Sequence, residues 1–144
     1  MNGTPAIPPP VNEPVLTYAP GTPERAALKA ELERQSNLVV DVPLIINGEE
    51  VRTGDTFDVV MPHSHGHVIA RAHKAGPEET QRAVDSAIAM QDEWSSMRWE
   101  DRAAIFLKAA DLLAGPWRQV LNASTMLGQS KTAHQAEIDA ACEI

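Results

Sequence analysis

The segment Gly128–Thr132, with the sequence GQSKT, holds a glycine, two hydroxyl side chains and a lysine, which are residue types of a phosphate-binding loop. Such a loop follows a strand and has the pattern G-x-x-x-x-G-K-[ST], in which the lysine comes directly after the second glycine. Lys131 instead comes three residues after Gly128, no glycine stands four or five residues upstream, and the preceding segment has a helical pattern. We therefore interpret GQSKT as a joint between two helices, with Gly128 as the C′ residue of the first and Ser130 or Thr132 as the N-cap of the second.

Three histidines, His63, His65 and His67, alternate in the segment MPHSHGHVIARAH. On a regular strand they would point to the same face, where imidazoles could bind a metal ion. Pro62 and Gly66 interrupt that strand, however, and no nearby cysteine or carboxylate completes a set of ligands. The favoured interpretation is a polar turn between two strands, with solvated histidines.

Cys142 is the only cysteine and so the only candidate thiol nucleophile. It stands late in a predicted helix and next to Glu143, where the local field disfavours a thiolate, so we interpret it as a small buried apolar residue. The three tryptophans could line a cofactor site, but their helical positions favour packing in the core or at its rim. These residues are Trp94, Trp99 and Trp117.

Glu137 and Asp139 are two positions apart on a predicted helix, so they face different ways and cannot act as a close pair of carboxylates. From the local sequence, solvated helix surface is the favoured interpretation, and the alternative is that one of the two points into a cleft. The residues therefore contain no general base paired with a nucleophile, no metal-ligand set and no G-x-G-x-x-G turn for a dinucleotide.

Composition excludes several classes of partner. The 144 residues carry 12 Lys and Arg against 20 Asp and Glu, a formal net charge of −8, and only six aromatic side chains of Phe, Trp and Tyr. A surface of that charge repels phosphate backbones and anionic lipids, so we expect no nucleic-acid partner and no membrane partner. No stretch reaches the roughly 18 apolar residues of a membrane span, and no signal peptide is present. With a single cysteine, which suits a reducing compartment, we predict a cytoplasmic protein.

The elements that must position these residues divide the chain in two. Residues 1–22 form a predicted extended proline-rich arm, and a helix should run from Pro23 to about residue 35. β-branched residues then predict short antiparallel strands, with a type I′ turn at Asn47-Gly48, a strand over residues 56–61 and another around residues 68–72. Four helices should follow, from Pro77, from near Glu100, from Pro116 and from around Thr132. The first is expected to include Trp94, and the second to bury Ile105, Phe106, Ala109, Leu112 and Leu113. The predicted fold class of this segment is α+β.

Several separated segments are similar to the opening of the aldehyde dehydrogenases: PLIINGEEV, the strand that ends in MPHS, VIARAHKAGPEETQRAVDSAIAMQDEW and RAAIFLKAADLLAG. Two more resemble one branch of that family, the 1-pyrroline-5-carboxylate dehydrogenases: NEPVLTYAPGTPERAALKAELE and GPWRQVLNASTMLGQSKTAHQAEIDAACE. The spelling LGQSK, where other branches carry E-x-G-K, is typical of this branch. The resemblance runs from about Asn12 to Ile144.

The resemblance implies that the complete protein has the α/β fold of the family and uses NAD to oxidise L-glutamate γ-semialdehyde, the open form of 1-pyrroline-5-carboxylate, to L-glutamate in proline degradation. In the family a thiolate attacks the aldehyde, hydride leaves to the nicotinamide, and water hydrolyses the thioester. The implied partners are a small-molecule substrate and further copies of the chain in a homo-oligomer.

Within this chain the resemblance assigns a role to one residue. Glu137, in QAEID, matches a glutamate beside the aldehyde-binding cleft and is the candidate substrate-binding residue. Cys142 does not match the motif of the catalytic cysteine. The catalytic residues and the NAD-binding site of the family are expected beyond Ile144, so no catalytic, cofactor-binding or metal-binding residue is predicted here.

The end of the chain completes the domain prediction. AEIDAACEI has no glycine or asparagine, no basic last turn and no proline to end a helix. We therefore expect residues 23–144 to be the N-terminal part of an aldehyde dehydrogenase NAD-binding domain, cut inside a helix and inactive alone. The alternatives are a stand-alone interaction or assembly module, and another aldehyde dehydrogenase branch, such as one that acts on succinate semialdehyde.

Overall fold

The computed structural model describes residue 9 and residues 11–142, with the backbone alone at residues 141 and 142. Helices flank a small set of strands. In chain order the elements are α1 (Pro23–Ser36), β1 (Val40–Val42), β2 (Leu44–Ile46), β3 (Glu49–Val51), β4 (Thr56–Met61), β5 (Ser64–His73), α2 (Pro77–Ala89), α3 (Gln91–Ser96), α4 (Trp99–Ala114), α5 (Arg118–Gln129), α6 (Ala133–Glu137) and the π-helical turn η1 (Ile138–Cys142).

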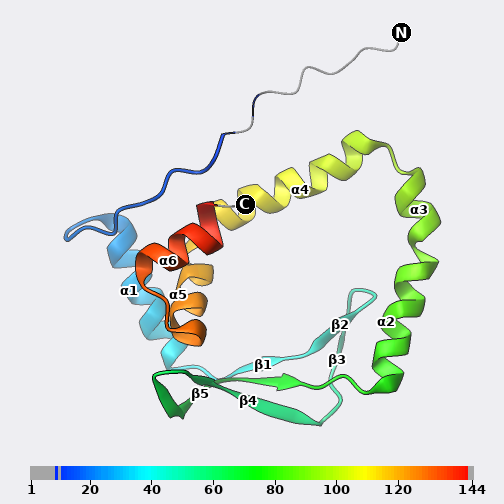
Figure 1. The fold of residues 1–144 in the computed structure, drawn as a ribbon, viewed down its shortest axis with the longest axis horizontal. Coiled ribbons are helices and arrows are strands. Elements are labelled where there is room, and N and C mark those ends of the chain that lie inside the picture. Colours follow the sequence, from blue (N-terminus) through cyan, green and yellow to red (C-terminus); the bar gives the residue numbers. More distant parts are fainter. Residues whose placement is uncertain (1–8, 10, 143–144) are drawn as a thin grey trace.

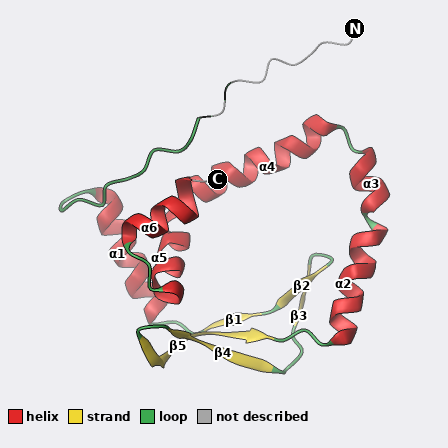
Figure 2. Cartoon of the chain, in the orientation of Figure 1, coloured by secondary structure: helices red, strands yellow, loops and turns green. Residues whose placement is uncertain are grey.

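Two groups of helices stand at opposite ends of the strands (Figure 1). At one end α1, α5 and α6 pack together, and the N-terminal arm runs past them. At the other end α2 rises from the strands, and α3 and α4 continue as an arch that returns to α5 and η1. Figure 2 shows the strands gathered at one edge of the molecule, away from the point where α4 meets α5. The chain thus brings its arm and its last helices together.

The strands form a three-stranded sheet in the order β1-β5-β4 and a separate hairpin of β2 and β3. Asn47 and Gly48 both have positive φ, 53° and 76°, as the expected type I′ turn requires. The prediction of antiparallel strands throughout is wrong for β1, which pairs in parallel with β5, Val40 opposite Ala70. The β2–β3 hairpin and β4 lie between these strands in the sequence, so β5 returns along β1 in the same direction. β4 and β5 are antiparallel as predicted.

Local signals placed most helix starts correctly. α1 begins at Pro23 and α2 at Pro77, each with proline in the first turn. The helix expected to continue from Pro77 through Trp94 is instead two helices, because the chain turns at Met90, which ends α2 and precedes α3. Helix α4 begins at Trp99, one residue before the predicted region.

The joint between α5 and α6 differs from the prediction by two residues. Gly128 lies inside α5, and Ser130 is the residue in the left-handed region, with φ 54°. Thr132 caps α6. The backbone amide of Gln135 donates to the Thr132 hydroxyl, and the backbone amide of Thr132 donates to the side-chain oxygen of Gln135. This reciprocal pair is a capping box. GQSKT is therefore a helix joint, as interpreted.

The core lies between the arm, α1 and α5. Tyr18, Leu28 and Ala123 are buried there, and four partly buried apolar residues pack against them: Leu16, Leu32, Met126 and Ala133. By contrast, none of the described residues of α2, α3 and α4 is buried. Ile105 and Phe106, expected in the core, are 51% and 66% exposed, although the Trp94 ring packs edge-on against Phe106. Among the described residues no helix is long and apolar enough to cross a membrane.

Candidate functional site

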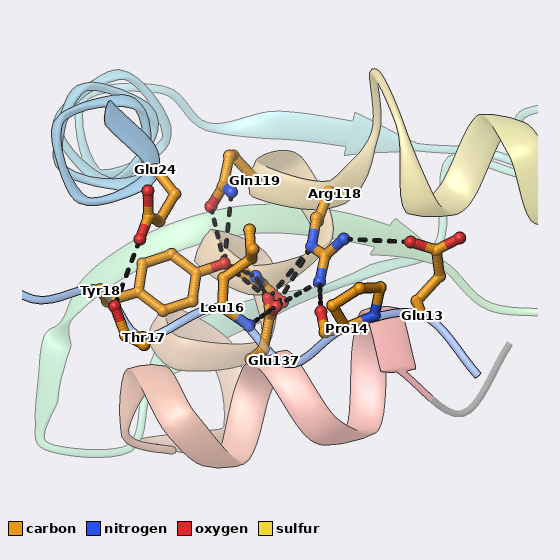
Figure 3. Close-up of polar contacts among 10 residues, drawn as sticks. Glu13, Pro14, Leu16, Thr17, Tyr18, Glu24, Arg118, Gln119 and Glu137 are labelled. Carbon is orange, nitrogen blue, oxygen red and sulfur yellow. Dashed lines mark hydrogen bonds and ion pairs between the residues drawn. The ribbon is translucent and has the colours of Figure 1, made fainter. Parts of the chain in front are cut away.

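Glu137 is the centre of a buried polar cluster. It is the last residue of α6, its side chain is fully buried, and it faces α5 and the N-terminal arm (Figure 3). The expectation of a solvated helix surface from local sequence is therefore wrong for this residue. Burying a charged carboxylate costs free energy unless hydrogen-bond donors surround it. The donors around Glu137 therefore determine whether the buried group stays charged.

Two segments, the N-terminal arm and α5, supply those donors. The Leu16 amide donates to Oε1 over 2.9 Å, and the Tyr18 hydroxyl donates to Oε2 over 2.5 Å, both from the arm. From α5, Asn122 Nδ2 donates to Oε2 over 2.8 Å. The Arg118 guanidinium donates to both oxygens through Nε and forms its shortest contact from Nη2 to Oε1. A carboxylate has about four acceptor positions, so these donors fill it.

Arg118 also binds the arm directly. Its Nη2 donates to the Pro14 carbonyl over 2.6 Å, and Nη1 lies 3.6 Å from the Glu13 carboxylate. The guanidinium has five N–H donors in a fixed plane, which allows it to serve Glu137 and the arm together. Arg118, on α5, thus joins Glu13 and Pro14 of the arm to Glu137 of α6.

The cluster holds both acidic groups away from their ordinary pKa values. Burial raises the pKa of Glu137, but the bonds from Arg118, Tyr18, the Leu16 amide and Asn122 outweigh it and lower the pKa to about 2. For Tyr18, burial and then its bond to Glu137 raise the pKa to about 12. The pair is therefore a carboxylate and a neutral phenol over the whole physiological range.

Two features show how strongly the cluster is constrained. Tyr18 has φ 52°, in the left-handed region, which for a bulky residue costs about 1–3 kcal/mol and persists only where its surroundings impose it. Asn122 Oδ1 is buried without a hydrogen-bond partner among the described residues, a cost of about 1–3 kcal/mol. Both free-energy costs arise at residues, Tyr18 and Asn122, that donate a hydrogen bond to the Glu137 carboxylate.

The sequence did not point to Tyr18, Arg118 or Asn122. The two on α5 read as ordinary helix positions, and Tyr18 lies in the proline-rich arm. The one available signal was the pair Leu16 and Tyr18, which alternate as buried residues of an extended segment do.

The other candidates do not form a site. His63 Nδ1 lies 3.2 Å from Ser130 Oγ, whereas His67 Nε2 lies 2.7 Å from the Ser36 carbonyl, so these two rings have separate partners. No group of His, Cys, Asp and Glu among the described residues could hold a metal ion. Lys131, of the GQSKT segment, pairs with Asp139, whose side chain is 42% exposed.

Trp94, Trp99 and Trp117 are 39%, 45% and 51% exposed, so the expectation that they pack in the core is wrong. Trp94 packs edge-on against Phe106, with the Arg102 guanidinium over its ring. The expectation of a buried Cys142 falls on a side chain outside the described ones.

A dinucleotide does not fit the described residues. In the Rossmann fold a nicotinamide cofactor is held at a glycine-rich turn from a strand into a helix, whose free amides receive the phosphates. The one turn of this kind, from β5 into α2, has a single glycine, and the Gly76 amide already donates to the Glu79 side chain over 2.8 Å. We therefore assign no step of a reaction to a cofactor held here.

Comparison with known proteins decides the family. The aldehyde dehydrogenase family model matches residues 50–144. The chain belongs to the aldehyde dehydrogenase family. Among curated relatives of this aldehyde dehydrogenase chain, the delta-1-pyrroline-5-carboxylate dehydrogenase of Agaricus bisporus is 54% identical over 139 residues, which are 96% of this chain and 26% of the relative. The mitochondrial human protein of that name is 44% identical over 133 residues, which are 92% of this chain and 24% of the human protein's length.

Solved structures agree with this family and its fold. The delta-pyrroline-5-carboxylate dehydrogenase of Mycobacterium tuberculosis, in a structure with bound NAD, matches 99% of this aldehyde dehydrogenase chain and 27% of its own, with a TM-score of 0.94 and 44% identity. The resemblance inferred from sequence is thereby confirmed, as is the mixed α and β fold class. The chain spans about a quarter of the length of the relatives that it matches.

The buried cluster predicts an unusual tyrosine titration. Tyr18 is the only tyrosine, so the near-ultraviolet absorbance of tyrosinate reports on it alone. In the folded chain the midpoint should lie at about 12, against 10.0 for the ordinary group, and it should return to the ordinary value in urea. Glu137→Gln should lower the folded midpoint part of the way, because burial of the phenol remains. A folded midpoint equal to that in urea would contradict the cluster.

Proposed function

We propose that these 144 residues are part of a longer protein that oxidises L-glutamate γ-semialdehyde, the open form of 1-pyrroline-5-carboxylate, to L-glutamate with NAD. Overall, the aldehyde carbon loses two electrons to NAD as hydride, water supplies the second oxygen, and two protons are released. Residues 23–144 would be the N-terminal part of its NAD-binding domain. The reaction belongs to proline degradation.

One observation carries this proposal. Similarity to 1-pyrroline-5-carboxylate dehydrogenases extends over 96% of the chain in sequence and 99% in structure, and includes the arm as well as the family domain. A likeness confined to the family domain would support only an aldehyde dehydrogenase of unspecified substrate.

The proposal also includes Glu137 as a substrate-side residue that lies beside the aldehyde cleft of the complete protein. Its position supports this role. Glu137 is the last residue before the π-helical turn η1, and π turns inside helices occur frequently at functional sites. The carboxylate is charged and held by the chain itself, so its place beside a cleft would be fixed before substrate arrives.

We further propose that the complete protein is a homo-oligomer in the cytoplasm. The single cysteine, which suits a reducing compartment, supports the cytoplasmic location, although several relatives carry the word mitochondrial in their names. Fractionation of cells that express the tagged complete protein would test the location, and light scattering would test the oligomer.

The enzymatic proposal is tested by NAD reduction. The complete protein should reduce NAD with 1-pyrroline-5-carboxylate and should do so far more slowly with succinate semialdehyde. The 144-residue chain alone should show no turnover, because the family resemblance places the catalytic cysteine and the NAD-binding site outside these residues. Turnover by the 144 residues would contradict this, and a preference of the complete protein for another aldehyde would assign it to another branch.

The role of Glu137 needs a separate variant. Glu137→Gln keeps the volume of the side chain and removes its charge, and we expect a rise in the KM for the aldehyde of about tenfold. The KM for NAD should stay unchanged. Unchanged KM and kcat for the aldehyde would limit Glu137 to holding the fold.

A further inference from the structure

We propose that the arm segment Glu13–Tyr18 is a positioning element of the aldehyde site, which fixes the carboxylate of Glu137 through Tyr18 and Arg118. The inference rests on the proposed function, because it takes Glu137 as a substrate-side residue. It adds two positioning residues to that site, and neither of them is assigned a contact with substrate or cofactor.

The first support is that Glu137 has no acceptor position left. Of its donors, the Leu16 amide and the Tyr18 hydroxyl belong to the arm, and Arg118 is itself bonded to the arm at Pro14. Figure 3 shows these groups converging on the carboxylate, with Tyr18 and Arg118 on different sides of it. The arm therefore controls, directly or through Arg118, most of the bonds that set where the charge lies.

The second support is that α6 cannot set this position alone. It has five residues, too few for a stable isolated helix, and among them only Ala136 and Glu137 are buried. The turn η1 that follows departs from α-helical geometry. A short helix between a capped joint and a π turn takes its place from its tertiary contacts, which here come from α5 and the arm.

The third support is that the described arm has few other polar anchors, beside the apolar packing of Leu16 and Tyr18. It has no helix or strand before Pro23, and Val11 and Val15 are exposed. Its bonds outside the cluster include one from Arg25 Nη1 to the Tyr18 carbonyl, over 3.1 Å. The same contacts thus hold the arm and Glu137, so loosening one loosens the other.

The strained backbone of Tyr18 fits this role. Its φ of 52° turns the chain so that the phenol enters the core beside Leu28 while the hydroxyl reaches Glu137. Strain of this kind is retained where the surroundings over-determine a residue, and it is concentrated at functional sites.

Two variants of the complete protein test the proposal by steady-state kinetics. Tyr18→Phe removes one donor to Glu137 and keeps the ring, and Arg118→Lys keeps the charge and removes the planar fork. We expect the KM for the aldehyde to rise about threefold and about tenfold, respectively, with kcat within about twofold and the KM for NAD unchanged. Ile46→Ala is the matched control, because Ile46 is buried in β2 outside the cluster. It should lower Tm without changing the KM for the aldehyde.

Hydrogen exchange supplies a readout that does not need activity. In Tyr18→Phe and Arg118→Lys, peptides from the arm and from α6 should both exchange faster, whereas Ile46→Ala should leave both unchanged. The proposal is overturned if the wild-type protein is active and both variants have the same KM for the aldehyde as wild type. It is also overturned if Ile46→Ala raises that KM as much as the two variants do. If the wild-type protein is inactive, the proposed function fails, and unchanged exchange in α6 would then overturn the coupling as well.

Discussion

Replacing Arg118 with alanine should lower the free energy of unfolding of the chain by about 3–5 kcal/mol, because it leaves the buried Glu137 carboxylate without its cation. The side chain of Glu137 is fully buried and that of Arg118 is 10% exposed, so water cannot replace the lost partner. The bonds from Arg118 to Pro14 and its ion pair with Glu13 are lost as well. Equilibrium unfolding in urea, followed by far-ultraviolet circular dichroism, measures the change.

Arg34→Ala is the control for that experiment. Arg34 also pairs with a glutamate, Glu31, over 2.5 Å, but its side chain is 53% exposed, and such pairs contribute about 0–1 kcal/mol. In a chain that already carries Glu137→Gln, Arg118→Ala should cost less than in the wild type, because no buried carboxylate is left unpaired. Equal losses of unfolding free energy in Arg34→Ala and Arg118→Ala would show that the buried cluster contributes no more to stability than an exposed ion pair.

The stability of the chain should fall in acid through Glu137. Burial raises its pKa, but the four groups that donate to it lower the pKa to about 2, against 4.5 for the ordinary group. Because the pKa is lower in the folded state, the stabilisation is complete above 4.5 and is lost as the pH falls toward 2. This difference corresponds to about 3 kcal/mol. Unfolding in urea at a series of pH values measures it, as the difference in free energy between wild type and Glu137→Gln.

A surface carboxylate provides the comparison. Glu100 pairs with Arg98 over 3.4 Å, and both side chains are exposed, by 41% and 75%. Glu100→Gln should therefore leave the acid dependence of stability nearly the same as in wild type. If Glu137→Gln also left it the same, the carboxylate would not be held as the contacts indicate.

Local chemistry predicted the elements of this fold well, and for identifiable reasons. Prolines 23 and 77 mark helix starts because proline fits the first turn, and Asn47-Gly48 marks a hairpin because both residues accept positive φ. The capping box at Thr132 is likewise a rule of neighbours in sequence. Such signals act over a few residues. They therefore determine where a helix or turn lies in the sequence, but not which other element it packs or pairs with.

Partnerships over long sequence distances were not predictable in this way. β1 pairs with β5 in parallel across an intervening hairpin, and nothing in the residues of β1 specifies that direction. The face of α4 that carries Ile105 and Phe106 has the apolar spacing of a buried helix, yet both side chains are more than half exposed. Periodicity shows which face of a helix is apolar and not whether that face is covered.

The candidate site shows the same limit most clearly. On its own helix Glu137 looks like Asp139, an acidic residue two positions away. Asp139 meets Lys131 from the nearby joint, whereas Glu137 is buried by an arm segment that precedes it by about 120 positions. Only the resemblance to a family singled out Glu137, and only the structure showed Arg118 and Tyr18 around it.

The distance in sequence between the arm and Glu137 has a consequence for synthesis. Leu16 and its acceptor are 121 positions apart, and a ribosome adds roughly 5–20 residues per second, so the arm waits roughly 6–24 s for its partner to be made. Throughout that interval the Leu16 amide and the Tyr18 hydroxyl have no Glu137 carboxylate to bind. The arm is therefore among the last segments of this cluster to be fixed in place.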